Sequence, residues 1–147
     1  MVLNPRGSAA ACKALVETGT VTLFVSQAIL AEVVDVLNRP RFRQIVPDLT
    51  AERIDLFVEE IAKLAIPISN VPEEFHYERD PEDEPYINLA LAVDAGYIVS
   101  LDNDLLDLMK PAMKTSSEFH RRFPMLRVVK PITLLYEIEQ RLKGSEP

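Results

Sequence analysis

Residues 79–107 read RDPEDEPYINLALAVDAGYIVSLDNDLLD, and this stretch decides the fold. An apolar segment at residues 86–93 predicts a buried helix, and Gly96 marks its expected end. The YIVS run at residues 97–100 predicts a short strand. Acidic side chains stand at both ends of this helix–strand unit: Asp80, Glu82, Asp83 and Glu84 before the helix, and Asp102, Asp104 and Asp107 after the strand.

Helices and strands alternate outward from this unit. Helices are expected at residues 8–18, 27–38, 51–65, 105–109 and 133–143, and strands at 20–25, 66–68 and 126–129. Residues 4–7 predict a turn, residues 39–43 the end of a helix, and residues 113–124 a polar loop or helical turn. This alternation predicts an α/β fold, a three-layer α/β/α arrangement around a short parallel sheet.

The bulk properties fit one domain over residues 1–147. The net charge of −7 argues against binding nucleic acid through a broadly basic surface, but a metal-dependent nuclease remains compatible with it. Cys12 is the single cysteine, which excludes an internal disulfide and favours a reducing cytoplasm. No apolar run is long enough to cross a bilayer, and Pro5 and Gly7 interrupt the short apolar start, which therefore does not read as a signal peptide.

Acidic residues from distant parts of the chain are expected at one rim of the sheet. In open parallel sheets, ligands bind beyond the carboxyl ends of the strands, where Asp83 and Asp102 are placed. At about 100° per residue, Glu32 falls at the edge of the apolar face of its helix. Each of these residues also has a purely structural interpretation. Asp83 could cap its helix, Asp102 could form an Asx turn and cap the next helix, and Glu32 could be a solvated residue on a helix rim. Together, clustered carboxylates favour a divalent cation, since Mg²⁺ and Mn²⁺ prefer oxygen ligands.

Four segments carry a family resemblance: LNPRG (3–7), VSQAILAEVVDVLNRPRF (25–42), DPEDEPYINLALAVDAGYIVSLDNDLLDL (80–108) and RVVKPITLL (127–135). In this order they resemble PIN-domain proteins, of the branch that contains toxin components of toxin–antitoxin systems. The resemblance implies a ribonuclease that uses Mg²⁺ or Mn²⁺, an RNA substrate and an antitoxin partner protein. A homodimer is expected on a separate ground, because an exposed sheet edge favours pairing with a second copy.

The resemblance also implies roles for individual residues. Glu32, Asp83 and Asp102 are the expected catalytic carboxylates and metal ligands, with Glu84 and Asp104 as further ligands or water-orienting groups. Arg39, Arg41 and Arg43 are candidates for contacts with RNA phosphates, and a solvated basic loop is the alternative reading.

One feature departs from the family pattern. Family members begin with a central strand that ends in an aspartate followed by Thr-Asn, and this sequence starts at Met1-Val2-Leu3 without them. Three explanations stay open: the flanking strands close up, another chain fills the gap, or the natural protein is longer. The absent ligand keeps a second hypothesis open, a catalytically inactive PIN-like domain that acts by binding proteins. A receiver-like domain is disfavoured because its early acid pair is missing, although Lys130 follows the last expected strand.

Overall fold

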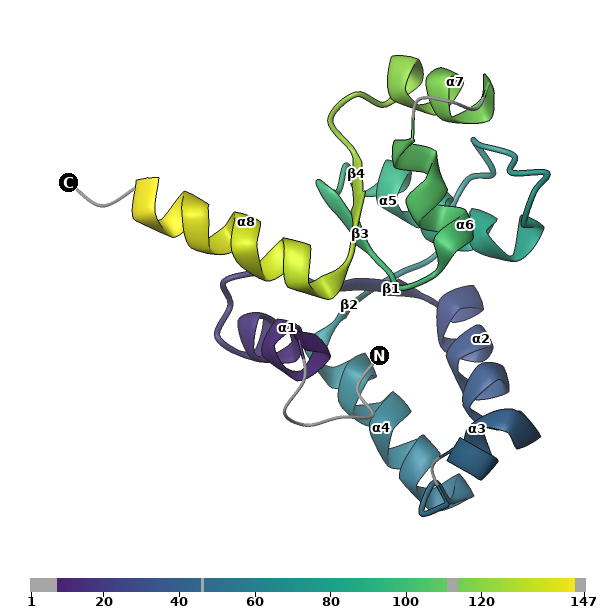
Figure 1. Cartoon of the computed structure of the whole chain (residues 1–147). Helices are drawn as coiled ribbons and strands as arrows, with labels where there is room; N and C mark the ends of the chain where they lie inside the picture. Colours follow the sequence, from purple (N-terminus) through teal and green to yellow (C-terminus); the bar gives the residue numbers. More distant parts are fainter. Residues whose placement is uncertain (1–7, 46, 111–113, 145–147) are drawn as a thin grey trace.

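The computed structural model describes residues 8–45, 47–110 and 114–144, so the turn expected at residues 4–7 lies outside the described part. The helices are α1 (Ser8–Glu17), α2 (Gln27–Leu37), α3 (Pro40–Ile45), α4 (Ala51–Leu64), α5 (Glu84–Ala92), α6 (Asn103–Leu106), α7 (Lys114–Arg122) and α8 (Pro131–Gly144). The strands are β1 (Phe24–Ser26), β2 (Ile66–Ile68), β3 (Tyr97–Val99) and β4 (Arg127–Val129), and two 3₁₀ turns, η1 (Pro81–Asp83) and η2 (Asp107–Met109), flank the central unit. Figure 1 shows the course of the chain.

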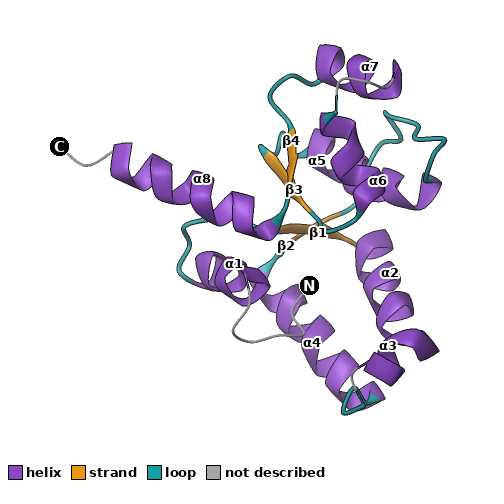
Figure 2. Cartoon of the chain, in the orientation of Figure 1, coloured by secondary structure: helices purple, strands orange, loops and turns teal. Residues whose placement is uncertain are grey.

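The predicted parallel pairing is present. In the described residues β1 pairs with β2 and β3 pairs with β4, both in parallel, as two separate two-stranded sheets (Figure 2). Helices α5 and α6 lie on one side of the β3–β4 pair and α8 lies on the other (Figure 1). The mixed α/β class with helices on both sides of parallel strands is therefore confirmed.

Two apolar clusters hold these layers together, and α5 belongs to both. Ile87 and Ala90 pack with the buried side chains of β3, α6, η2, α7 and β4, whereas Leu89 packs with those of α2 and α4. Helix α5 also contacts both β1 and β3, one strand of each pair. Helix α5, which directly follows the acidic stretch 80–83, is thus fixed by packing on both sides.

Several predicted boundaries are wrong. The strand expected at 20–25 is the three-residue β1, and the expected helix end at 39–43 contains the short helix α3. Helix α5 ends at Ala92, with Asp94 rather than Gly96 adopting a positive φ of 53°. An aspartate tolerates this left-handed conformation, so no glycine was needed. Residues 114–122 form α7, because Ser116 and Phe119 bury one face of a mainly polar segment.

Other predicted ends hold. Ser26 caps α2 by accepting a hydrogen bond from the Ile29 backbone N–H, and Thr50 caps α4 through the Arg53 N–H. Gly19 follows α1 with a φ of 77°, which favours glycine. No described helix has the length and apolar character to cross a membrane.

Candidate metal centre

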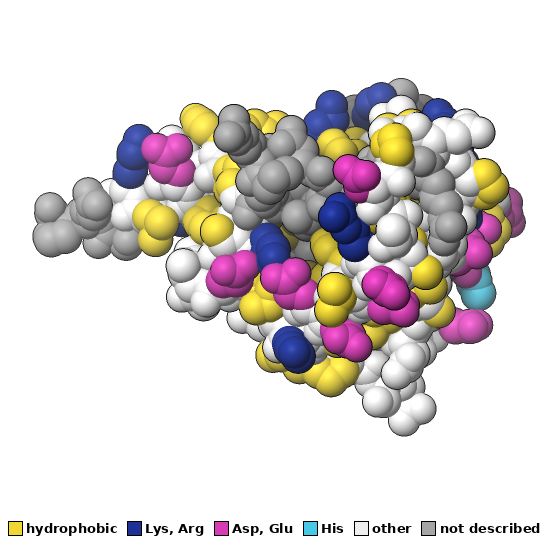
Figure 3. All heavy atoms as spheres, turned by 90° about the horizontal axis from the view of Figure 1, so that it is seen from below, with side chains coloured by type: hydrophobic (Ala, Val, Ile, Leu, Met, Phe, Trp, Pro, Cys, Tyr) yellow, Lys and Arg dark blue, Asp and Glu magenta, His cyan; other side chains and the backbone are white. Residues whose placement is uncertain are grey.

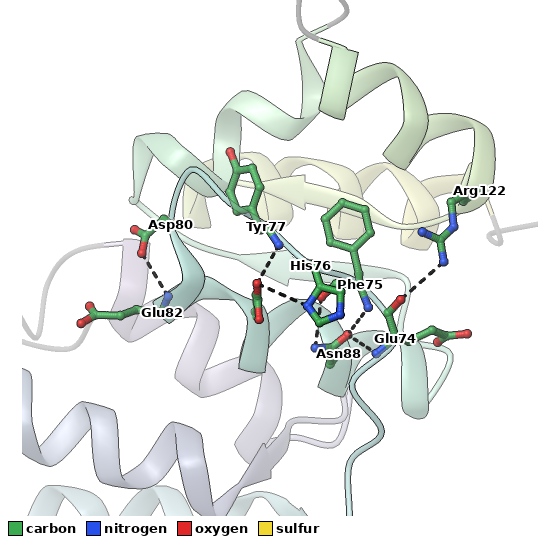
Figure 4. Close-up of polar contacts among 9 residues, drawn as sticks. Glu74, Phe75, His76, Tyr77, Asp80, Glu82, Asn88 and Arg122 are labelled. Atoms are coloured by element: carbon green, nitrogen blue, oxygen red, sulfur yellow. Dashed lines mark hydrogen bonds and ion pairs between the residues drawn. The ribbon is translucent and has the colours of Figure 1, made fainter.

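The first half of the site is the entry into α5. Asp80 accepts a hydrogen bond from the Glu82 backbone N–H at 3.2 Å and so caps the turn η1, in which Pro81 is the first residue (Figure 4). Asp83 closes that turn and directly precedes α5. This local capping places two carboxylates side by side at the start of the central helix.

The second half is the connection from β3 to α6. Ser100 Oγ accepts a hydrogen bond from the Asp102 N–H at 2.9 Å, and Asp102 Oδ1 accepts one from the Asp104 N–H at 2.8 Å. Asp102 is therefore the N-cap of α6, as the capping interpretation predicted. One Asp102 oxygen is used in this cap, which fixes the orientation of the carboxylate.

The fold brings these two halves together. Each of four carboxyl groups offers an oxygen, and these oxygens all lie within 4.8 Å of one another: Asp80, Asp83, Asp102 and Asp104. We call them the four-acid group. Like charges this close repel one another unless a proton or a cation lies between them.

Asp83 shows that repulsion most clearly. The residue is 4% exposed, and its Oδ2 atom has no hydrogen-bond partner among the described residues. Burial, then the charges of Asp102 and Asp80, raise the pKa of Asp83 to about 8. Burial also raises the pKa of Asp80. A buried carboxylate oxygen without a partner is costly, and a hard divalent cation would both pair it and offset the charge. The residues present therefore fit such an ion.

Glu32 lies at the rim rather than inside the four-acid group. It sits half-buried on α2, and burial raises its pKa, while a hydrogen bond from the Tyr86 hydroxyl acts in the opposite direction. Its charge in turn contributes to the raised pKa of Asp83. Glu32 is thus near enough to act electrostatically on the group, and Tyr86 of α5 is its hydrogen-bond partner.

Glu84 has a different role from the one suggested by its position in the sequence. Its Oε1 accepts a hydrogen bond from the Tyr77 backbone N–H at 2.8 Å and lies 3.9 Å from His76 Nδ1. These contacts tie the loop before η1 to α5, and Glu84 is not one of the four-acid group.

A buried asparagine anchors the same loop one turn further along α5. Asn88 is 5% exposed, and its Oδ1 accepts hydrogen bonds from the backbone N–H groups of Phe75 and Glu74 at 2.8 and 3.1 Å (Figure 4). Its Nδ2 donates to the Phe75 carbonyl at 3.4 Å. Glu84 and Asn88 therefore hold the chain that leads to Asp80.

The candidate RNA-binding arginines lie at the far end of α2. Arg39 is exposed and forms an ion pair with Asp35, 3.2 Å from Nη2 to Oδ2. Arg41 is exposed on α3, and Arg43 belongs to the same helix, although its side chain is outside the described part. Arg41 and Arg43 are on a helix and not in the predicted loop, whereas Arg39 lies in the bend between α2 and α3.

Sequence reasoning did not select Asp80 as a ligand. Asp80 was visible as part of the acidic run, but spacing alone could not show that η1 folds its carboxylate back beside Asp83. The Asp-Pro pair at 80–81, a common turn start, was the available signal.

The comparisons with known proteins give one match. No curated protein and no solved structure matches the chain. A family model described as "PIN domain" matches residues 1–104, a span that includes Glu32 and the whole four-acid group. That span covers more than half of the chain, and the protein therefore belongs to the PIN-domain family, a nuclease superfamily whose members generally use divalent metals and act on RNA.

Proposed function

We propose that this protein is a divalent-cation-dependent ribonuclease that hydrolyses RNA phosphodiester bonds. The observation that carries the proposal is the buried Asp83 oxygen without a partner, inside a group of four carboxylates in a PIN domain. A structural acid in such a place would be expected to have a basic or amide partner.

The four-acid group would hold the cation, with Asp83 and Asp102 as its central ligands and Asp80 and Asp104 beside them. Mg²⁺ or Mn²⁺ bound there would supply an activated water and stabilise charge on the phosphoryl group. Asp83 must lose its proton to serve as a ligand, and its raised pKa predicts that cation binding releases a proton.

The remaining residues would position the substrate. Glu32, oriented by Tyr86, lies at the rim where it can accept a proton from a water or orient it. Arg39, Arg41 and Arg43 are proposed to contact RNA phosphates. On the face in Figure 3, acidic and basic side chains are interspersed, so contacts with RNA there would be local ones and not those of a long basic stripe.

Cleavage of a single-stranded RNA at millimolar Mg²⁺ or Mn²⁺ tests the proposal. We expect EDTA to abolish cleavage, and Asp83→Asn and Asp102→Asn to reduce it by at least about 100-fold, the scale on which one charge-stabilising group acts. Glu32→Gln is expected to reduce it as well. Asp94→Asn is the matched control, because Asp94 is exposed and stands outside the four-acid group.

The same experiment separates the second candidate function. Cleavage that survives in Asp83→Asn and Asp102→Asn would refute the proposed site. A cation-loaded protein that cleaves no RNA would favour the catalytically inactive, protein-binding domain. The toxin role and the antitoxin partner remain predictions from the resemblance. The homodimer remains a prediction from an exposed sheet edge, and the cytoplasmic location one from the single cysteine.

A further inference from the structure

Arg79 links the four-acid group to a second acidic residue outside it. The guanidinium Nε lies 2.7 Å from Asp104 Oδ1, and Nη2 lies 2.6 Å from Asp107 Oδ2. One planar side chain thus bridges two carboxylates from α6 and η2. A guanidinium suits this geometry because its donors form a rigid fork.

Asp104 has a fixed backbone but a partly exposed carboxylate. Its backbone is fixed, since its N–H donates to Asp102 and its carbonyl accepts a hydrogen bond from the Tyr77 hydroxyl at 2.6 Å. Its side chain, however, is 34% exposed and lies among three other carboxylates. Repulsion would turn this carboxylate toward water, and the Arg79 guanidinium opposes that rotation.

Asp107 provides the fixed end of the bridge. Its side chain is only 14% exposed, and its Oδ1 pairs with Lys110 Nζ at 2.8 Å. Its carbonyl accepts a hydrogen bond from Ser116 Oγ at 2.9 Å, which ties it to α7. The hydrogen bonds that Lys110 and Arg79 donate to this carboxylate, and their positive charges, hold the pKa of Asp107 below its usual range. Asp107 therefore stays charged and fixed, and keeps Arg79 in place.

We propose that Arg79 is a positioning residue that, anchored by Asp107, holds the Asp104 carboxylate in the four-acid group and so completes the cation site. Arg79 would act on the cation through Asp104 and would not bind it. This inference rests on the cation site of the proposed function, but it does not depend on whether the protein cleaves RNA.

Charge-preserving variants test it. Arg79→Lys keeps the positive charge but can pair well with only one acid, and Asp107→Glu keeps the negative charge but displaces the anchor. We expect each variant to lower Mn²⁺ affinity by about tenfold, measured by calorimetric titration of the full chain. Tenfold is the lower end of the affinity loss that follows removal of a residue supporting a metal ligand. In an Asp104→Asn background, Arg79→Lys is expected to add less than about twofold, because the group that it positions is gone.

Arg127→Lys is the matched control. Arg127 pairs with Glu137 of α8, and it stands opposite Tyr97 at the first residue of β3, whereas the four-acid group lies beyond the last. We expect this variant to bind Mn²⁺ as the unchanged protein does. Urea unfolding of all variants without metal separates a stability loss from an affinity loss.

Three results would overturn the proposal. The first is unchanged Mn²⁺ affinity in both charge-preserving variants, and the second is no Mn²⁺ binding by the unchanged protein. The third is that Arg79→Lys lowers Mn²⁺ affinity as much in the Asp104→Asn background as it does in the unchanged protein. Failure of the nuclease proposal looks different. In that case Mn²⁺ binds, the two variants weaken it, and no RNA is cleaved.

Discussion

Asp83 gives the metal-free protein a defined pH dependence. Its pKa is about 8 in the folded state against an ordinary value of 3.8, so between these values the folded state holds a proton that the unfolded chain has lost. Stability therefore falls as pH rises across this window, by up to about 1.4 kcal/mol per pH unit for one group. In urea unfolding with EDTA at pH 5, 6.5 and 8, we expect Asp83→Asn to flatten this decline and Asp94→Asn to leave it. Identical slopes in Asp83→Asn and the unchanged protein would contradict the assignment.

The acidic residues also show what residue spacing can predict. Asp83 and Asp102 come together because each stands directly at the end of a predicted element, one before α5 and one after β3. The spacing could not decide among consecutive acids, since the turn η1 directs Asp80 toward the group while Glu84 binds the loop backbone. Hydrogen bonds to the backbone made that choice, and they depend on the fold.

At the scale of elements, α5 organises the site through Asn88. In Asn88→Leu the buried Phe75 N–H and the part-buried Glu74 N–H lose their acceptor. Each unpaired group costs about 1–3 kcal/mol, so we expect the two together to lower the free energy of unfolding by about 2–6 kcal/mol in urea unfolding. Mn²⁺ affinity should fall too, because the loop leads to Asp80. Gln140→Leu, on the exposed part of α8, is the control. If Asn88→Leu proved as stable as this control, the loop would have to be held by other contacts.

Elements were predicted best where packing agrees with local preference. The amphipathic α4 and the capped α2 were found nearly to the residue, because one face of each is apolar and each begins at a side-chain cap. The strand predicted at 66–68 coincides with β2, whereas the other three strands were predicted too long or offset, since only three residues of each take part in a ladder. For α7 the sequence left a loop and a helical turn open, because only two buried side chains, Ser116 and Phe119, fix this mainly polar segment as a helix. The pairing of the strands into two separate sheets depends on tertiary contacts, and the spacing of apolar residues along the sequence does not predict it.

The whole molecule should unfold as one unit, even though the family match ends at residue 104. Ile87 and Leu89 of α5 pack into different apolar clusters, so neither cluster can lose its packing without disturbing that helix. Phe119 is 0% exposed in one cluster and Ile54 is 1% exposed in the other. We expect Phe119→Ala and Ile54→Ala to cost about 3–5 and 2–5 kcal/mol. Each should shift a single transition, with far-ultraviolet circular dichroism and tyrosine signals coinciding. Separate transitions in Phe119→Ala, with the Ile54 cluster still folded, would mean that the two apolar clusters unfold independently and that α5 does not couple them.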